Sequence, residues 1–251
     1  MSRARPSPRG DAVVWDFDGT LVDSSVKNWG VSRAIIEHIT AQPADTFEAL
    51  ASLAGYRAAL AGTQNWREFY ARAFGLSEAD IDRAGGLWAP YQLRDTTPTP
   101  LIAGIPEVLR SLRHLPQGIV SQNARQAIAA VLDGNGLGGR FPAVIGFEEV
   151  DLRRQKPAPE GLLRCVELLT AMRPGHVFYI GDHETDAVCA ARANAVLAER
   201  KGGVKVISIA ALYAAEKPVA WAVEPDHTVS RPHEIVEIVA HYTGSPPSAC
   251  N

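Results

Sequence analysis

The chain has 251 residues, of which 46% are hydrophobic and 21% charged, a usage that excludes a disordered or fibrous protein. Its length predicts one large domain, or one domain that carries an insert. The 25 basic and 28 acidic side chains leave a net charge of −3, so we expect neither nucleic acid nor a membrane surface as a partner.

Cysteine usage and hydropathy predict a cytoplasmic protein. The three cysteines, Cys165, Cys189 and Cys250, are odd in number and have no spacing typical of a metal site, which argues against a disulfide framework. The longest nearly apolar run, Val206–Ala215, has ten residues, whereas a membrane-spanning helix needs about 20. No apolar stretch of signal-peptide length follows the N-terminal arginines. We expect flexible ends at residues 1–10 and 244–251.

The first predicted elements are one strand and a group of helices. The apolar run Ala12–Trp15 stops abruptly at Asp16 and predicts a buried strand. Residues 24–97 contain no convincing strand, and their helical periodicity predicts a helical insert. Its four helices are expected at Val26–Thr40, Ala44–Leu60, Trp66–Phe74 and Ser77–Tyr91. The last of them opens with Ser77 and Asp80 at the spacing of a capping box.

After the insert, short apolar strands alternate with helices. Strands are predicted at Gly118–Ser121, Ala143–Gly146, His176–Ile180 and Val204–Ile207, with an extended segment at Asp226–Val229. Helices are predicted at Glu107–Leu115, Gln126–Leu132, Glu160–Met172, Thr185–Ala195 and Pro232–His241. This alternation predicts the α/β class, with a doubly wound parallel sheet that includes the first strand. The expected core is therefore residues 1–23 and 98–251, interrupted by the helical domain of residues 24–97.

Two carboxylates, Asp16 and Asp18, follow the first predicted strand. They can face a common cleft only where the strand ends and the backbone turns, and Gly19 permits that turn. Close carboxylates repel each other unless a cation or a shared proton offsets their charge. Mg²⁺ suits such a site, because it prefers oxygen ligands and takes one or two carboxylates together with a substrate phosphate.

Three further motifs lie near predicted strand ends, where open parallel sheets bind their ligands. Ser121 places a hydroxyl at the end of a strand. Lys156 precedes two prolines just before a helix, and it is the only lysine between Asn28 and Arg200. Asp182 follows a strand and a glycine, and Asp186 lies four residues later at the start of a helix. The sequence therefore predicts one site with several acids and a single ammonium group.

These four motifs, in this order over residues 12–195, resemble the signatures of the haloacid dehalogenase-like superfamily of phosphohydrolases. The insert after the first motif resembles the helical cap of phosphoglycolate phosphatase-like members, and the resemblance implies a Rossmann-like core. It implies that Asp16 is the nucleophile and that Asp18 is the general acid and base. It further implies that Ser121 and Lys156 bind the phosphoryl group.

The resemblance also implies a metal site and a reaction. Mg²⁺ would be held by Asp16, by Asp182 and by the backbone carbonyl of Asp18, while Asp186 would orient a metal-bound water or Lys156. The implied activity is a Mg²⁺-dependent phosphatase that hydrolyses a small phosphorylated metabolite, phosphoglycolate-like or a sugar phosphate, through an aspartyl-phosphate.

Several choices remain open at this stage. A β-phosphoglucomutase-like phosphomutase uses the same pair of aspartates, and a non-catalytic binding or regulatory protein could use the same fold. Relatives place Asn directly after the hydroxyl residue, whereas Gln122 stands between Ser121 and Asn123 here, so either side chain could reach the site. His183 is not assigned to the metal, and the oligomeric state is open.

Overall fold

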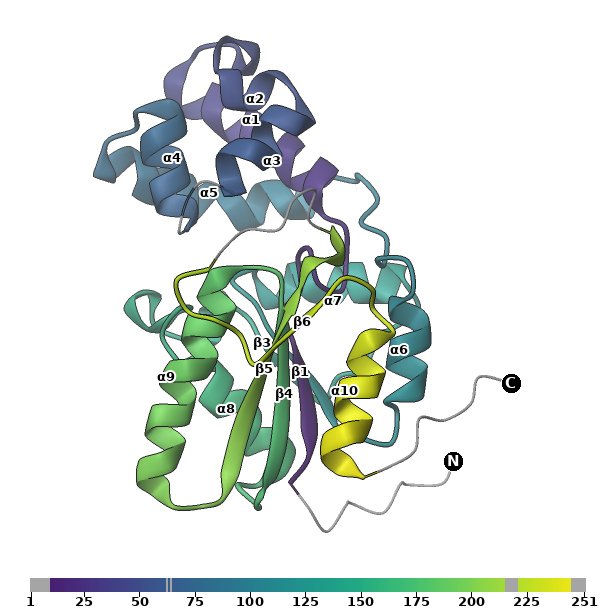
Figure 1. The fold of residues 1–251 in the computed structure, drawn as a ribbon. Coiled ribbons are helices and arrows are strands. Elements are labelled where there is room, and N and C mark those ends of the chain that lie inside the picture. The colour runs from purple at the N-terminus through teal and green to yellow at the C-terminus, as the bar shows by residue number, and fades with distance from the viewer. Residues whose placement is uncertain (1–9, 62, 64, 215–220, 245–251) are drawn as a thin grey trace. The chain divides into compact units, whose positions relative to one another are not determined.

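The computed structural model describes residues 10–61, 63, 65–214 and 221–244, which form two compact units (Figure 1). The core extends to Val22 and resumes at Leu101, and the helical unit between them is Asp23–Pro100; the predicted insert was residues 24–97. Most of the predicted flexible ends lies outside the described residues. Of the two described positions there, Gly10 is buried and donates its N–H to Pro174 at 2.8 Å, and Gly244 caps a helix.

The core is built on one six-stranded sheet in which every pair of neighbouring strands is parallel, as predicted. The strands are β1 (Ala12–Trp15), β2 (Gln117–Val120), β3 (Ala143–Ile145), β4 (Gly175–Gly181), β5 (Val204–Ala211) and β6 (His227–Val229). Their order is β3-β2-β1-β4-β5-β6, so the first strand lies inside the sheet between β2 and β4. From β1 the chain first adds strands on one side, β2 and β3, and then on the other side, β4 to β6. Such a switch in direction leaves a crevice at the carboxyl ends of the strands.

Helices cover both faces of the sheet (Figure 1). Val13 and Trp15 of β1 face α6 (Ile105–Ser111), α7 (Arg125–Gly134) and α10 (Glu234–Thr243). Ala12 and Val14 face α8 (Glu160–Thr170) and α9 (Glu184–Arg200). Because successive side chains of a strand point to opposite faces, an all-apolar strand is what a sheet buried on both faces requires. Short 3₁₀ turns complete the core at Phe147–Glu149, Leu152–Arg154 and Leu212–Ala214.

The helical unit has its own hydrophobic cluster. Its helices are α1 (Ser25–Thr40), α2 (Glu48–Ala51), α3 (Leu53–Ala61), α4 (Trp66–Phe74) and α5 (Glu78–Arg94), with a 3₁₀ turn at Ala44–Thr46. The single helix predicted at Ala44–Leu60 is wrong, because the backbone is extended at Phe47 and Ser52. The Phe47 ring packs edge-on against Phe74, and the Ser52 hydroxyl accepts from the N–H of Gly55 at 3.0 Å. Packing and a local cap thus divide the helical run.

Two further observations concern the length of the helices and the state of the cysteines. Across the part of the chain that the structure describes, no helix has the length and apolar character needed to cross a membrane. Cys165 and Cys189 are buried free thiols, and Cys250 lies outside the described residues.

Candidate active site

The predicted site residues of the core lie where strands end and helices begin. Asp16 directly follows β1, Ser121 follows β2 and Asp182 follows β4, while Asp186 lies in the first turn of α9. Lys156 precedes α8, in a turn whose Lys156–Pro157 peptide bond is cis. Since the strands are parallel, their carboxyl ends share one edge of the sheet, and residues that are up to 170 positions apart in sequence meet there.

The ammonium group of Lys156 joins two of the predicted carboxylates. Its Nζ donates to Oδ1 of Asp16 and, at 2.8 Å, to Oδ1 of Asp186. The side chain is 6% exposed. Burial alone lowers the pKa of a lysine, but the carboxylates of Asp16 and Asp186 outweigh that effect and raise the pKa of Lys156 above its usual value. Lys156 is therefore a permanent cation in the middle of the acids.

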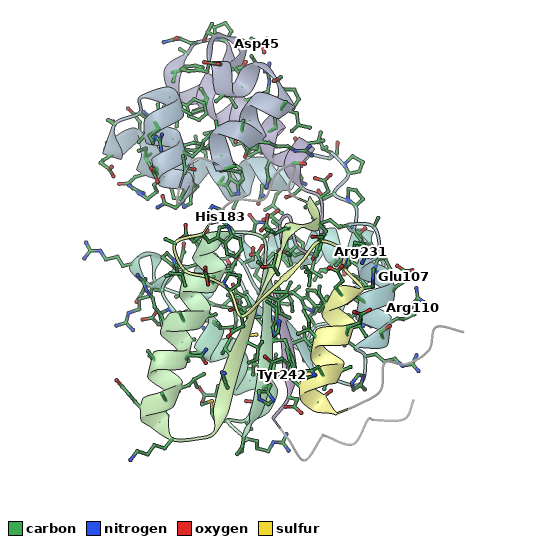
Figure 2. The ribbon with its side chains drawn as sticks, in the orientation of Figure 1. Asp45, Glu107, Arg110, His183, Arg231 and Tyr242 are labelled. Atoms are coloured by element: carbon green, nitrogen blue, oxygen red, sulfur yellow. The ribbon has the colours of Figure 1, made fainter. Side chains whose placement is uncertain are left out.

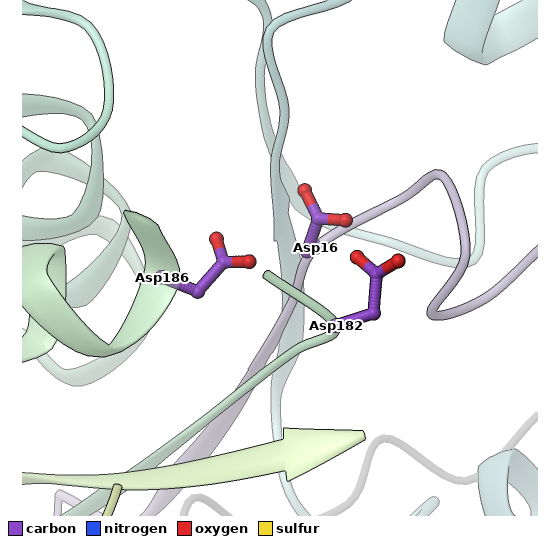
Figure 3. A group of neighbouring side chains, drawn as sticks. All are labelled: Asp16, Asp182 and Asp186. Atoms are coloured by element: carbon purple, nitrogen blue, oxygen red, sulfur yellow. The ribbon is translucent and has the colours of Figure 1, made fainter. Parts of the chain in front are cut away.

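Three carboxylates lie close together at this site (Figure 3). Oxygen atoms of Asp16, Asp182 and Asp186 lie within 4.8 Å of one another. Burial raises the pKa of Asp16 to about 7, and repulsion from Asp186 and Asp18 adds to the rise while Lys156 opposes it. Burial, followed by repulsion from Asp16 and Asp186, also raises the pKa of Asp182 well above its usual value. Asp16 and Asp186 are buried and Asp182 is partly buried, and one ammonium group does not offset three carboxylates. This cluster of hard oxygen donors therefore suits a divalent cation.

Gly19 allows the turn after Asp18 to approach Asp182 closely. Gly19 adopts a φ of +71°, and a Cβ built at this position would lie 2.0 Å from Oδ2 of Asp182. Only glycine tolerates both the left-handed backbone and this contact. The turn after Asp18 is closed by a hydrogen bond from the N–H of Gly19 to the carbonyl of Val22 at 2.9 Å.

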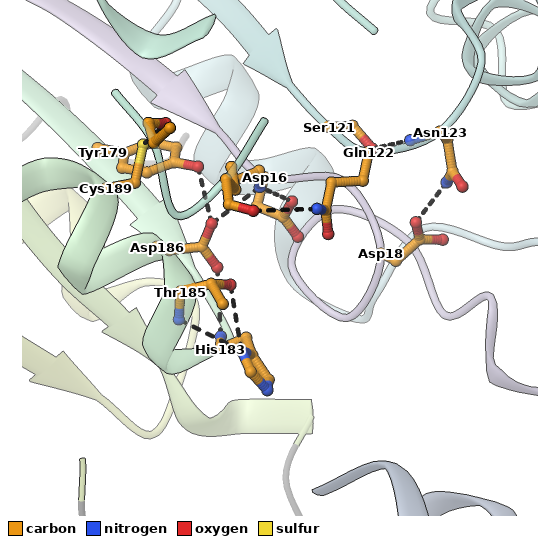
Figure 4. Close-up of polar contacts among 12 residues, drawn as sticks. Asp16, Asp18, Ser121, Gln122, Asn123, Tyr179, His183, Thr185, Asp186 and Cys189 are labelled. Carbon is orange, nitrogen blue, oxygen red and sulfur yellow. Dashed lines mark hydrogen bonds and ion pairs between the residues drawn. The ribbon is translucent and has the colours of Figure 1, made fainter. Parts of the chain in front are cut away.

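Asp186 is held by donors on both of its oxygens (Figure 4). Its Oδ1 accepts from Lys156 and, at 2.7 Å, from the phenol of Tyr179 in β4. Its Oδ2 accepts from the backbone N–H of His183 at 3.3 Å. The Tyr179 ring also lies beneath Lys156, with Nζ 5.7 Å from the ring centroid. Sequence reasoning missed Tyr179, because a tyrosine inside an apolar strand has the pattern of an ordinary core residue.

Gln122 and Asn123 make different contacts in the structure (Figure 4). Gln122 is exposed and donates its side-chain N–H to the backbone carbonyl of Lys156 at 3.2 Å. Asn123 is buried and donates its Nδ2 to Oδ2 of Asp18. Ser121 is also buried, and its Oγ accepts from the N–H of Asn123 at 3.1 Å. The carboxyl group of Asp18 is thus turned toward Asn123.

Side chains donate hydrogen bonds to three consecutive backbone carbonyls of the turn that carries Lys156. In addition to Gln122 on the carbonyl of Lys156, Arg192 donates to the carbonyl of Pro157 at 3.2 Å. The thiol of Cys189 donates to the carbonyl of Ala158 at 3.4 Å. Arg192 and Cys189 belong to α9, which also carries Asp186. The sequence held no signal for these contacts, because they join distant segments through backbone atoms.

His183 has a structural role at the start of α9. Its Nδ1 accepts from the backbone N–H of Thr185 at 3.3 Å, so the imidazole caps the helix. It lies at the end of the core where β4 finishes, whereas Tyr242 lies toward the opposite end of the sheet (Figure 2).

Comparisons with known proteins agree with this arrangement. The family model of the haloacid dehalogenase-like hydrolases matches residues 11–194. A phosphoglycolate phosphatase of Synechococcus elongatus is 31% identical over 196 residues, covering 71% of this chain and 78% of that protein. The pyrophosphatase PpaX of Oceanobacillus iheyensis is 26% identical over 186 residues, covering 72% and 79%. The crystal structure of a hydrolase from Pseudomonas syringae has the same fold, with a TM-score of 0.66 at 17% identity over 92% of this chain and 98% of that one. The chain therefore belongs to the haloacid dehalogenase-like hydrolases and is an enzyme.

Proposed function

We propose that the protein is a Mg²⁺-dependent phosphatase that hydrolyses a small phosphomonoester through a covalent phosphoryl group on Asp16. The observation that carries this proposal is the buried contact between Lys156 and Asp16 inside a cluster of carboxylates. A buried ammonium group beside a carboxylate suits the transfer of an anionic phosphoryl group, because it neutralises charge on both reactants. The phosphatase names of relatives at 26% and 31% identity support the same reaction class.

The donor set fits a magnesium ion. Asp16 offers buried carboxylate oxygens and Asp182 partly buried ones, and the backbone carbonyl of Asp18 lies in the turn that follows Asp16. Asp186 is less suited to a direct bond, because Lys156, Tyr179 and the N–H of His183 already occupy its oxygens. When bound, the ion offsets negative charge on the acids and on the phosphoryl oxygens.

The protein's own residues carry the proposed steps. A carboxylate oxygen of Asp16 forms a bond to phosphorus while the bond from phosphorus to the leaving oxygen breaks. Asp18 gives its proton to that leaving oxygen and later takes a proton from the water that releases phosphate. Lys156 stays charged throughout and balances the transferred oxygens, and the Ser121 hydroxyl donates to one of them.

The helical unit bears on which substrates reach the site. We infer that Asp23–Pro100 acts as a cap that limits the substrate to a small phosphorylated metabolite, phosphoglycolate-like or a sugar phosphate. The phosphoglycolate phosphatase of Synechococcus elongatus supports the first class. A screen of phosphorylated metabolites identifies the substrate. Product analysis distinguishes hydrolysis, which releases free phosphate, from a mutase reaction, which returns an isomerised sugar phosphate.

The variant Asp16→Asn tests the proposed function. It keeps the size of the side chain and most of its contacts but removes the nucleophilic oxygen, so we expect activity on 4-nitrophenyl phosphate with Mg²⁺ to fall at least about 10³-fold. The variant should remain folded, as measured by circular dichroism. Equal release of phosphate by the wild type and Asp16→Asn contradicts the mechanism, as does an idle wild type.

A further inference from the structure

The backbone N–H and the backbone carbonyl of Asn123 both form hydrogen bonds. Its N–H donates to the hydroxyl of Ser121 at 3.1 Å, and its carbonyl accepts from the N–H of Phe147 at 3.0 Å. The residue is 7% exposed and directly precedes the segment that leads into α7. The backbone of Asn123 is therefore fixed, and its side-chain amide contacts Asp18.

The contact between these two side chains has a defined direction. The Nδ2 group of Asn123 donates to Oδ2 of Asp18, and an amide NH₂ can donate but not accept. A protonated carboxyl group whose Oδ2 accepts this bond carries its proton on Oδ1. Asn123 thereby fixes both the orientation of the Asp18 carboxyl group and the oxygen from which a proton can leave.

We infer that Asn123 is a positioning residue for proton transfer by Asp18, an inference that rests on the proposed function. In the step that forms the bond from Asp16 to phosphorus, the electron pair of the breaking bond goes to the leaving oxygen. That oxygen takes the proton from Oδ1 of Asp18, which becomes a carboxylate still held by Asn123. Proton transfer of this kind contributes about 10²–10⁴-fold when the acid is correctly aligned.

The inference predicts a dependence on the basicity of the leaving group. A 4-nitrophenolate ion is a weak base and leaves without a proton, whereas an unsubstituted phenolate is a stronger base and benefits from one. Phenyl phosphates with different ring substituents have similar sizes, so they vary basicity while binding remains comparable. The measured quantity is kcat/KM, which reports the steps up to departure of the leaving group.

The experiment compares Asn123→Ala and Asn123→Asp with the wild type on 4-nitrophenyl phosphate and phenyl phosphate, each with Mg²⁺. Neither replacement has an N–H to donate to Asp18. We expect kcat/KM for phenyl phosphate to fall at least about tenfold more than that for 4-nitrophenyl phosphate. Activity that persists on 4-nitrophenyl phosphate shows at the same time that the variants are folded.

Gln122→Ala is the matched control. It removes the neighbouring amide, which contacts the carbonyl of Lys156 and not Asp18. Lys156 acts on the phosphoryl group of both substrates, so this variant should lower kcat/KM for both by the same factor.

An equal fall in kcat/KM on both substrates in the Asn123 variants overturns the inference, and so does no fall on either. Loss of all activity in both variants also overturns it, since Asn123 would then support folding or phosphate binding. Failure of the proposed function gives a different result. In that case the wild type would release 4-nitrophenol no faster than Asp16→Asn does.

Discussion

The phenol of Tyr179 donates to Oδ1 of Asp186 at 2.7 Å, and the same oxygen accepts from Lys156 at 2.8 Å. Burial raises the pKa of Tyr179 well above its usual value, so the phenol is a neutral donor at physiological pH. The two donors fix the carboxylate of Asp186 on the side that faces Lys156. Asp186 thereby positions the cation of the site.

Tyr179→Phe tests this relationship, because it keeps the ring under Lys156 and removes only the hydroxyl group. We expect a loss of about 1.5–3 kcal/mol in the free energy of unfolding, the usual contribution of a hydrogen bond to a charged group. We also expect kcat/KM to fall several-fold, because Asp186 no longer holds Lys156 in one place. Chemical denaturation and steady-state kinetics measure the two effects. Unchanged kinetics in a destabilised variant limits Tyr179 to a role in folding.

Lys156→Met should abolish activity and destabilise the metal-free protein. The replacement has a similar length, but it leaves Asp16 and Asp186 buried without their ion-pair partner. Breaking a buried pair in this way costs about 3–5 kcal/mol. Denaturation in EDTA at neutral pH measures the cost. Part of it should be recovered at low pH, where the carboxyl groups take up protons; a stability equal to that of the wild type contradicts this account.

The stability of the metal-free protein should fall as the pH rises from about 4 to about 7. Burial raises the pKa of Asp16 from 3.8 to about 7, so in this window the folded protein keeps a proton that the unfolded chain has released. The free energy of unfolding must then decrease with pH. A bound cation favours the ionised carboxyl groups and should offset the loss. The thermal shift caused by Mg²⁺ is therefore expected to be larger near pH 8 than near pH 5.

Asp16→Asn is the control for this pH dependence, because its amide does not titrate. Its metal-free melting temperature should change less with pH than that of the wild type over the same range. A Mg²⁺ shift that is the same at both pH values would argue against a cation bound among these acids.

Gly19→Ala should weaken both folding and cation binding. The added methyl group would lie 2.0 Å from Oδ2 of Asp182 at a φ of +71°, so both the turn and the carboxylate must move. The left-handed backbone alone costs about 1–2 kcal/mol for alanine. We expect a lower melting temperature and a loss of most of the thermal shift that Mg²⁺ causes in the wild type.

Gly86→Ala is the matched control for that substitution. Gly86 lies inside α5, and a Cβ there meets nothing within 4 Å. We expect this variant to be more stable by about 0.5–1 kcal/mol, because alanine has the higher helix propensity. Equal behaviour of the two variants in differential scanning fluorimetry contradicts the role assigned to Gly19.

Local pattern was sufficient to predict most of the fold. The apolar run Ala12–Trp15 ends at an acid, and such a run is typical of a strand in a parallel sheet that is buried on both faces. Trp66–Phe74 was predicted from its periodicity with the observed bounds, and in the structure Asn65 caps its first turn and Gly75 ends it in a left-handed conformation. β5 was predicted only to Ile207, whereas it extends to Ala211, where Ile209–Ala211 pair with β6.

The sequence by itself determined which residue types occupy the ends of the strands, because Asp16, Ser121 and Asp182 each lie in a local motif at the end of a recognisable apolar run. It likewise placed Lys156 just before a predicted helix. Only the tertiary structure decided how they are connected. Lys156 contacts Asp16, which is 140 residues away, while Gln122 contacts the carbonyl of Lys156 and Asn123 contacts Asp18. Such contacts depend on strand order and on the exact direction of each turn, and neither is encoded in the spacing of residues along one segment.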